Sequence, residues 1–174
     1  MATSTRVSLE EYFRTYYEPE CELIDGELRP KPMPTPPHSL MQSQVMKLLW
    51  PYEEPCRGRV LPELNLLLPG EVILIPDVVF SAPGQPLDER DALDTPPLLC
   101  IEIMSPSQSF SELYQKCISY LHWGVPYCWI IDPMKRLAWQ IEADELPREI
   151  PADGSLRAGE IDVKLAELFR RDPV

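Results

Sequence analysis

Histidine is scarce in this chain of 174 residues, which contains only His38 and His122. Two histidines cannot build a histidine-rich zinc site. The sequence also contains no P-loop, GxGxxG, GxSxG or HExxH pattern. It therefore carries no signature of a phosphate-binding loop, a dinucleotide fold, an α/β-hydrolase serine or a zinc protease.

The sequence also lacks cysteines at metal-binding spacing and lacks long apolar runs. The five cysteines are odd in number and show no CxxC spacing, so we expect reduced, mostly buried thiols rather than disulfides or a zinc ribbon. Reduced thiols favour a cytoplasmic location. No apolar run approaches the roughly 18 residues of a membrane span. The N-terminal segment MATSTRVSLEEYF lacks the apolar core of a signal peptide.

Basic side chains are outnumbered. Sixteen Lys and Arg stand against 28 Asp and Glu, which gives a formal net charge of −12. Such a charge repels nucleic acid at long range, and this argues against a protein that coats DNA regardless of sequence. A nuclease stays possible, because bound divalent cations reverse the field near a site.

What is present suits a globular protein. The chain is long enough to bury a core without disulfides, and its hydrophobic fraction of 44% and charged fraction of 25% are ordinary. We predict a single domain over residues 1–174, with a core at residues 8–141 and a C-terminal extension at 142–174.

Three helices are predicted from capping signals and apolar stripes. Two begin at a capping box, in which a serine is followed three residues later by a glutamate. A connector with four prolines in seven residues (31–37) leads into the helix between them. The helices are expected to begin near Leu9, to run from His38 to about Tyr52, and to run from Ser109 to about Trp123, where Gly124 ends the last one.

Strands are predicted from alternation and from continuous apolar runs. Asp25-Gly26 indicates a hairpin turn. The run LLCIEIM (98–104) predicts a central strand, and the helix after it implies a parallel crossover to the next strand. The further strands are expected at residues 59–68, 71–81, 127–131 and 136–141. Residues 83–97 are expected to form a loop, and 161–169 a short helix or extended arm.

Glu102 is the least expected side chain in the sequence, because it lies in the middle of the apolar run LLCIEIM. An unpaired carboxylate there would be costly. It must be hydrogen-bonded, protonated, bound to metal or paired with a lysine or arginine. A structural ion pair and a functional site explain Glu102 about equally well.

Asp77 is a second carboxylate that enters an apolar strand, after Pro76. Alone it reads as a turn residue. Together with Glu102 on an adjacent strand it could share one divalent cation, since Mg²⁺ accepts a few carboxylate oxygens and fills its octahedron with water or phosphate. A metal held there would polarise a phosphodiester and activate water.

Lys116 lies on the helix that follows Glu102, on one stripe with Glu112 and Tyr120. If this stripe faces the end of the strand, the ammonium could stabilise charge on a phosphate or orient the attacking water. The alternative is a surface lysine paired with Glu112.

Three further residues could support a site. Glu63 could add a third carboxylate, although an exposed strand glutamate is equally possible. His38 could contact phosphate or help with protons, with a local capping role as the alternative. Glu22, before the Asp25-Gly26 turn, ranks below Glu63.

These motifs together resemble a known family. The runs CELIDGEL, Pro76-Asp77, IEIMSPS and GVPYCWIIDP, with His38, Lys116 and Tyr120 in order between them, resemble the Uma-two family, which is grouped with the PD-(D/E)XK nucleases. The resemblance implies an α/β (mixed α+β) fold with a restriction-endonuclease-like core, a mixed sheet flanked by helices. It aligns Asp77 and Glu102 with the two acidic motif residues. Met104 stands where the pattern has lysine, and Lys116 takes that role from the following helix.

The function that the resemblance implies is a divalent-metal-dependent DNA endonuclease. Asp77, Glu102 and the backbone carbonyl of Ile103 would bind Mg²⁺, or Mn²⁺ in its place, and Lys116 would act on water or phosphate. Tyr120, His38 and Glu63 would support the site. A homodimer is expected, because enzymes of this kind often pair two sites to cut both strands. Two alternatives remain: a non-cleaving interaction module on the same fold, and a metal phosphoesterase acting on RNA or nucleotides.

Overall fold

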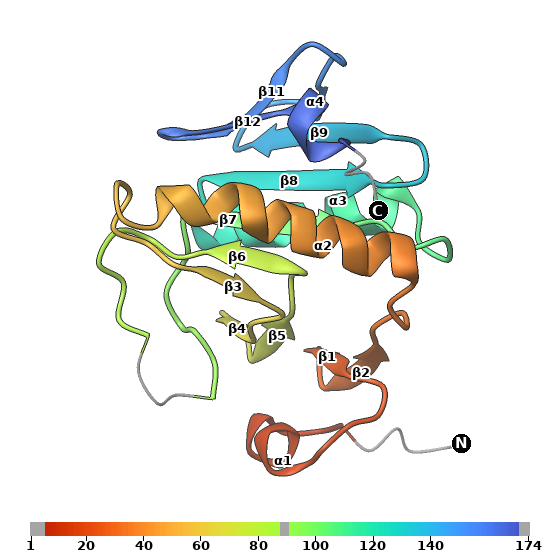
Figure 1. The fold of residues 1–174 in the computed structure, drawn as a ribbon. Coiled ribbons are helices and arrows are strands. Elements are labelled where there is room, and N and C mark those ends of the chain that lie inside the picture. The colour runs from red at the N-terminus through yellow and green to blue at the C-terminus, as the bar shows by residue number, and fades with distance from the viewer. Residues whose placement is uncertain (1–5, 88–90, 171–174) are drawn as a thin grey trace.

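A six-stranded mixed sheet forms the centre of the molecule (Figure 1). The computed structural model describes residues 6–87 and 91–170. The strand order is β10-β9-β8-β7-β6-β3. β7 and β8 are parallel, as the crossover predicted, and the other neighbours are antiparallel. The strands are β3 (Val60–Pro62), β6 (Val78–Phe80), β7 (Leu99–Ile103), β8 (Tyr127–Asp132), β9 (Leu137–Glu142) and β10 (Arg148–Glu149).

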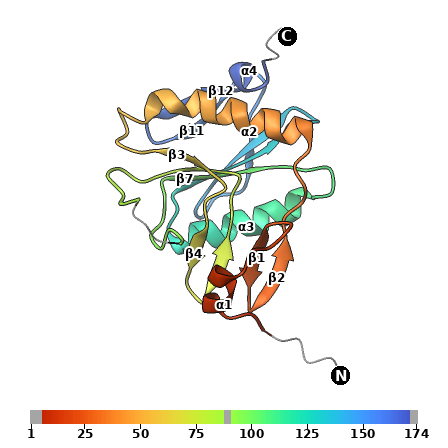
Figure 2. The same cartoon turned by 60° about the horizontal axis from the view of Figure 1, so that its bottom comes forward.

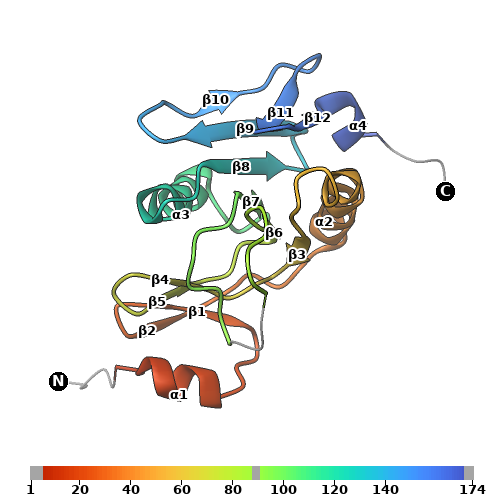
Figure 3. The ribbon, with the colours of Figure 1, turned by 90° about the vertical axis from the view of Figure 1, so that its left-hand side faces the viewer.

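Two long helices cover opposite faces of this sheet, α2 (Pro36–Leu49) and α3 (Phe110–Trp123) (Figure 3). Ile101 and Ile103 of β7 pack in the same cluster as the buried side of α2, whereas Cys100 packs in the cluster of α3. Because side chains alternate along a strand, Glu102 lies on the α3 face. The predicted mixed sheet flanked by helices is confirmed.

A second, four-stranded sheet lies beside the first, in the order β2-β1-β5-β4 (Figure 2). Its strands are β1 (Cys21–Ile24), β2 (Glu27–Pro30), β4 (Leu66–Leu68) and β5 (Val72–Leu74). The predicted hairpin is confirmed, with Asp25 and Gly26 in the left-handed conformation that its turn requires. α1 (Leu9–Arg14) packs Tyr12 against this sheet, in one cluster with Leu23 and Ile73.

The prediction of single strands at residues 59–68 and 71–81 was wrong, because each segment is divided between the two sheets. The chain leaves the large sheet after Pro62, forms β4 and β5 of the small sheet, and returns at Asp77. Glu63 has a φ of 47°, which lies in the left-handed region and outside the β region. Pro76 cannot donate a ladder hydrogen bond. The two crossings lie side by side, since the N–H of Glu63 donates to the carbonyl of Asp77 at 3.3 Å.

The helix termini follow the predicted capping. Ser8 accepts a hydrogen bond from the N–H of Glu11, and Ser109 and Glu112 form the complete capping box of α3. α3 ends at Gly124 with a φ of 117°. α2 begins at Pro36, two residues before the predicted start, because proline is well suited to the first helical position. It continues into a short 3₁₀ helix, η1 (Trp50–Tyr52).

The described part of the predicted C-terminal extension adds an edge strand to the large sheet, and its later elements pack on the α2 side of that sheet. It forms β10, a two-stranded sheet and a short helix, and it buries Leu156, Ile161 and Leu168 in the cluster that contains α2. The last elements are β11 (Ser155–Ala158), β12 (Ile161–Lys164) and α4 (Leu165–Leu168). The predicted loop at residues 83–97 is irregular apart from a bridge between Leu93 and Leu66, and its residues 88–90 lie outside the described residues.

All five cysteines are free, and all but Cys56 are buried. In the described ranges, none of the helices has both the length and the apolar character needed to cross a bilayer.

Candidate active site

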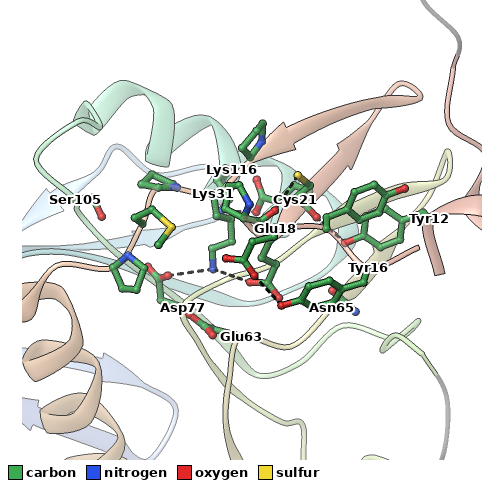
Figure 4. Close-up of a pocket in the computed structure, with 18 of the residues that line it drawn as sticks. Tyr12, Tyr16, Glu18, Cys21, Lys31, Glu63, Asn65, Asp77, Ser105 and Lys116 are labelled. Carbon is green, nitrogen blue, oxygen red and sulfur yellow. Dashed lines mark hydrogen bonds and ion pairs between the residues drawn. The ribbon is translucent and has the colours of Figure 1, made fainter. Parts of the chain in front are cut away.

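A pocket of about 680 Å³ opens at the junction of the two sheets (Figure 4). Asp77, Glu102 and Lys116 all line it, so the structure brings the three predicted residues together. Asp77 lies on the second crossing, between β5 and β6, Glu102 lies on β7, and Lys116 lies on α3. The candidate site thus depends on the arrangement of both sheets and one helix.

Asp77 is buried and held from three directions. Its Oδ2 accepts hydrogen bonds from the N–H of Ile103 at 2.7 Å, and it lies 3.3 Å from Nε2 of His38. Its Oδ1 lies 3.3 Å from Nζ of Lys31. Burial by itself raises the pKa of Asp77, but the His38 hydrogen bond, the Lys31 charge and the Ile103 N–H together hold that pKa below its usual value. Asp77 is therefore a permanent negative charge at neutral pH.

Glu102 is only 2% exposed and is bound through one oxygen. Its Oε1 accepts from the hydroxyl of Tyr120 at 2.7 Å and lies 2.8 Å from Nζ of Lys116. Burial raises the pKa of Glu102 to about 7; the Lys116 charge opposes this rise, and the charges of Asp77 and Glu22 add to it. Glu102 therefore changes its charge near neutral pH.

Lys116 does not pair with Glu112, which was the alternative from the sequence. Its Nζ lies 2.7 Å from Oε1 of Glu22 and 2.8 Å from Oε1 of Glu102. Burial lowers the pKa of Lys116, but the charges of Glu102 and Glu22 outweigh burial and raise it. Lys116 is a charged bridge between β7 and β1.

The supporting residues lie in different positions. Tyr120 contacts Glu102 directly, and His38 contacts Asp77 directly. Glu63 is exposed, lines the pocket and touches Asp77 only through the backbone, because it occupies a turn and not the strand face expected for it. The N–H of Ile103 binds Asp77, while a role for its carbonyl stays a prediction.

Two contact residues were underrated or missed by sequence reasoning. Glu22 ranked below Glu63, yet it is buried and binds both Lys116 and the N–H of Ile75, the latter at 2.9 Å. The signal that singled out Glu102 applies to it, since Glu22 is also a carboxylate within an apolar strand. Lys31 was missed, because nothing in the proline-rich connector indicates which part of the chain its side chain meets.

The pocket wall opposite the large sheet is aromatic and acidic. Tyr12, Phe13 and Tyr16 line it together with Glu18 and Glu20. Tyr16 is 85% exposed, and its hydroxyl donates to Glu18 at 2.8 Å. The carboxylates that line the pocket outnumber its cations.

The donor set fits a cation that keeps its water. Within residues 6–87 and 91–170, no group of three or more His, Cys, Asp or Glu side chains is arranged to hold a metal ion. Two carboxylates are enough for Mg²⁺, which fills its shell with waters and substrate oxygens, but they do not make a zinc cage. The charge of Asp77 raises the pKa of Glu102, and a divalent cation shared by the two would remove this repulsion.

Comparisons with known proteins bear on the family and on the fold of this chain. The family model Uma2, described as "Putative restriction endonuclease", matches residues 9–151. A crystal structure described as "a putative nuclease belonging to DUF820", from Anabaena variabilis, superposes with a TM-score of 0.83 at 24% identity, over 94% of this chain and 97% of that chain. This likeness shows the fold. A cryo-EM structure of a DrdV–DNA complex gives a TM-score of 0.45 at 17% identity, over 64% of this chain and 10% of that chain. No curated protein matches significantly.

Proposed function

The chain belongs to the Uma2 (Uma-two) family, and from this premise we propose that it is a divalent-metal-dependent endonuclease that hydrolyses phosphodiester bonds in DNA. One observation carries the proposal. The two carboxylates Asp77 and Glu102, which come from different strands, converge in one pocket together with the ammonium of Lys116. This is the set of groups that metal-assisted phosphodiester hydrolysis needs.

Each residue has a distinct role in this proposal. Asp77 and Glu102 would hold Mg²⁺, or Mn²⁺ in its place, and the carbonyl of Ile103 would be a further ligand. When bound, the metal polarises the phosphodiester and lowers the pKa of a bound water. Lys116 orients the attacking water. Its contact with Glu102, at 2.8 Å, holds the ammonium in the position from which it does so.

The supporting residues act through these groups. Tyr120 holds Glu102 by its hydroxyl, and His38 holds Asp77, so both are positioning residues. Glu63 is exposed and lines the pocket, where it can meet a hydrated metal ion or substrate. A homodimer would supply the second site needed to cut both strands, and sedimentation would test it.

Plasmid cleavage tests the proposal. Wild-type protein should nick or linearise plasmid DNA in Mg²⁺ or Mn²⁺ and not in EDTA. Asp77→Ala should lose at least about 100-fold of the rate, since removing a metal ligand removes transition-state stabilisation of several kcal/mol. Asp153→Ala, an exposed aspartate outside the pocket, is the matched control. No cleavage by wild type, or equal cleavage by Asp77→Ala, would sink the proposal.

A non-cleaving interaction module is the second candidate. The net charge of −12 and the acidic wall of the pocket favour it. It predicts no site-dependent metal uptake. Calorimetry with Mn²⁺ separates the two, because uptake by wild type that is lost in Asp77→Ala contradicts an inert module. A metal phosphoesterase for RNA or nucleotides would be recognised by a substrate panel in the same metal.

A further inference from the structure

Two lysines enter the pocket, and each bridges two carboxylates across the junction of the sheets. Lys116 bridges Glu22 and Glu102. Lys31 bridges Glu20 and Asp77. Among the described residues that line the pocket, these are the only lysines, and none is an arginine. A substrate phosphate in the pocket must therefore find its side-chain ammonium at one of the two.

Lys116 is the more completely neutralised of the pair. Its contacts are short, 2.7 Å to Glu22 and 2.8 Å to Glu102, and both partner side chains are largely buried. Two of its three N–H donors are committed to carboxylates that water cannot screen. A phosphate at Lys116 would be a third anion in contact with one cation.

The positive charge of Lys31 is less fully neutralised by its carboxylate partners than the charge of Lys116 is. Its Nζ lies 3.3 Å from Asp77 and 3.9 Å from Glu20, so only the first contact is a hydrogen bond. The Glu20 side chain is 47% exposed and hence solvated. Asp77 also accepts a hydrogen bond from the Ile103 N–H, so Lys31 is not the sole group that balances its negative charge. At least one donor of Lys31 stays available.

The fold also fixes Lys31 in place before any ligand arrives. Its side chain is only 13% exposed, and its backbone N–H donates to the carbonyl of Glu20 at 2.8 Å. Pro30 and Pro32 restrict the backbone on both sides. The ammonium lies inside the pocket, joined by dashed lines to Asp77 and to the acidic wall opposite (Figure 4). Preordering of this kind reduces the entropy lost on binding.

We propose that Lys31 is the phosphate-binding residue of this pocket and contacts a phosphodiester oxygen of a nucleic acid strand. Lys116 stays with its two carboxylates and does not take the phosphate. The proposal rests on the proposed function, because the phosphate belongs to the nucleic acid that the site would cleave.

The salt dependence of binding tests this assignment. Anisotropy of a labelled oligodeoxynucleotide duplex, measured in Ca²⁺ at several NaCl concentrations, gives the slope of log K against log [salt]. Loss of one phosphate contact should make the slope of Lys31→Met less steep by about 0.9. Lys31→Arg, which keeps the charge, and Lys164→Met, an exposed lysine outside the pocket, should keep the wild-type slope.

The possible outcomes separate the two proposals. An unchanged slope for Lys31→Met overturns the assignment, whatever Lys116→Met does, while the nuclease proposal stands. A wild type that binds no nucleic acid overturns both. Lys31→Gln, which keeps a polar group beside Asp77, gives the same readout if methionine prevents folding, and thermal melting shows which variants are folded.

Discussion

At the scale of single residues, the pocket is a set of carboxylates whose charges depend on one another. Asp77 is kept ionised by three donors, whereas Glu102 changes its charge near pH 7 because burial and two neighbouring carboxylates oppose its ionisation. Perturbed pKa values of this kind are one of the signs of a candidate functional site. The contacts with Tyr120 and Lys116 both use Oε1 of Glu102, and Glu102 lines the pocket.

The pKa of Glu102 predicts how stability depends on pH. The folded value is about 7, while an unfolded glutamate has a pKa of roughly 4.3. Between these values the folded protein binds more protons than the unfolded chain, so the free energy of unfolding should fall by about 3 kcal/mol as pH rises from 4.5 to 7.5. The lowered pKa of Asp77 acts only at lower pH.

Urea unfolding at pH 5 and pH 8 would measure this effect. Glu102→Gln cannot ionise and should show a smaller difference between the two pH values than wild type. Glu145→Gln, an exposed glutamate, should behave like wild type. Equal pH dependence in Glu102→Gln and wild type would show that another group is responsible.

Lys116 should be essential for stability as well as for the site. Lys116→Met leaves Glu102 and Glu22 without their cation and should cost about 3–5 kcal/mol of unfolding free energy at pH 8. Adding Glu102→Gln should restore part of this loss, because one uncompensated charge is removed. Denaturant unfolding of the single and double variants gives the coupling, and additive losses would speak against a buried bridge.

At the scale of elements, the site is built where the chain crosses between sheets. Glu63 and Asp77 lie at the two crossings, β1 brings Glu22 beside β5, and α3 lays Lys116 over β7. None of these elements makes the pocket alone. α3 carries both Lys116 and Tyr120, so its first turn supports the site from a distance.

The capping box of α3 can be tested separately from the chemistry. Ser109→Ala removes the oxygen that accepts from the N–H of Glu112 and should cost about 1 kcal/mol of stability. Metal uptake should be unchanged, because Ser109 does not line the pocket. Ser111→Ala on the same helix is the control and should be close to neutral. A neutral Ser109→Ala would show that the cap contributes nothing.

At the scale of the whole molecule, the two sheets and the C-terminal segment enclose most of the apolar side chains. Cys100, Cys117 and Cys128 lie together in the cluster between the large sheet and α3. Burial raises the pKa of each of these thiols, so they are inert in the folded state. The thiols therefore report on the integrity of the fold.

Thiol labelling should count one accessible cysteine in the native protein. Cys56 is partly exposed and the other four are buried, so a colorimetric reagent at pH 8 should modify one thiol quickly and five in denaturant. Cys56→Ser should abolish the fast reaction. Rapid modification of two or more thiols in the native state would contradict the packing described here.

Sequence alone was sufficient wherever the signal is local or concerns burial. Serine–glutamate pairs set the starts of two helices, Asp25-Gly26 set the hairpin, and the apolar run around Glu102 set the central strand. Glu102 stood out because a carboxylate within a buried apolar strand loses its contact with water and needs another partner. These features depend on neighbours in the chain, which the sequence displays directly.

Only the tertiary structure decided which charges meet. Lys31 and Asp77 are 46 residues apart, and Glu22 lies 53 residues from the Ile75 N–H that it binds. The crossings at Pro62 and Pro76 divided segments that alternate like single strands, and this division placed Asp77 at the junction. Pairing between distant segments follows from the packing of whole sheets, which local pattern does not encode. The sequence determined that Glu102 needs a partner, and the fold decided that Lys116 and Tyr120 supply it.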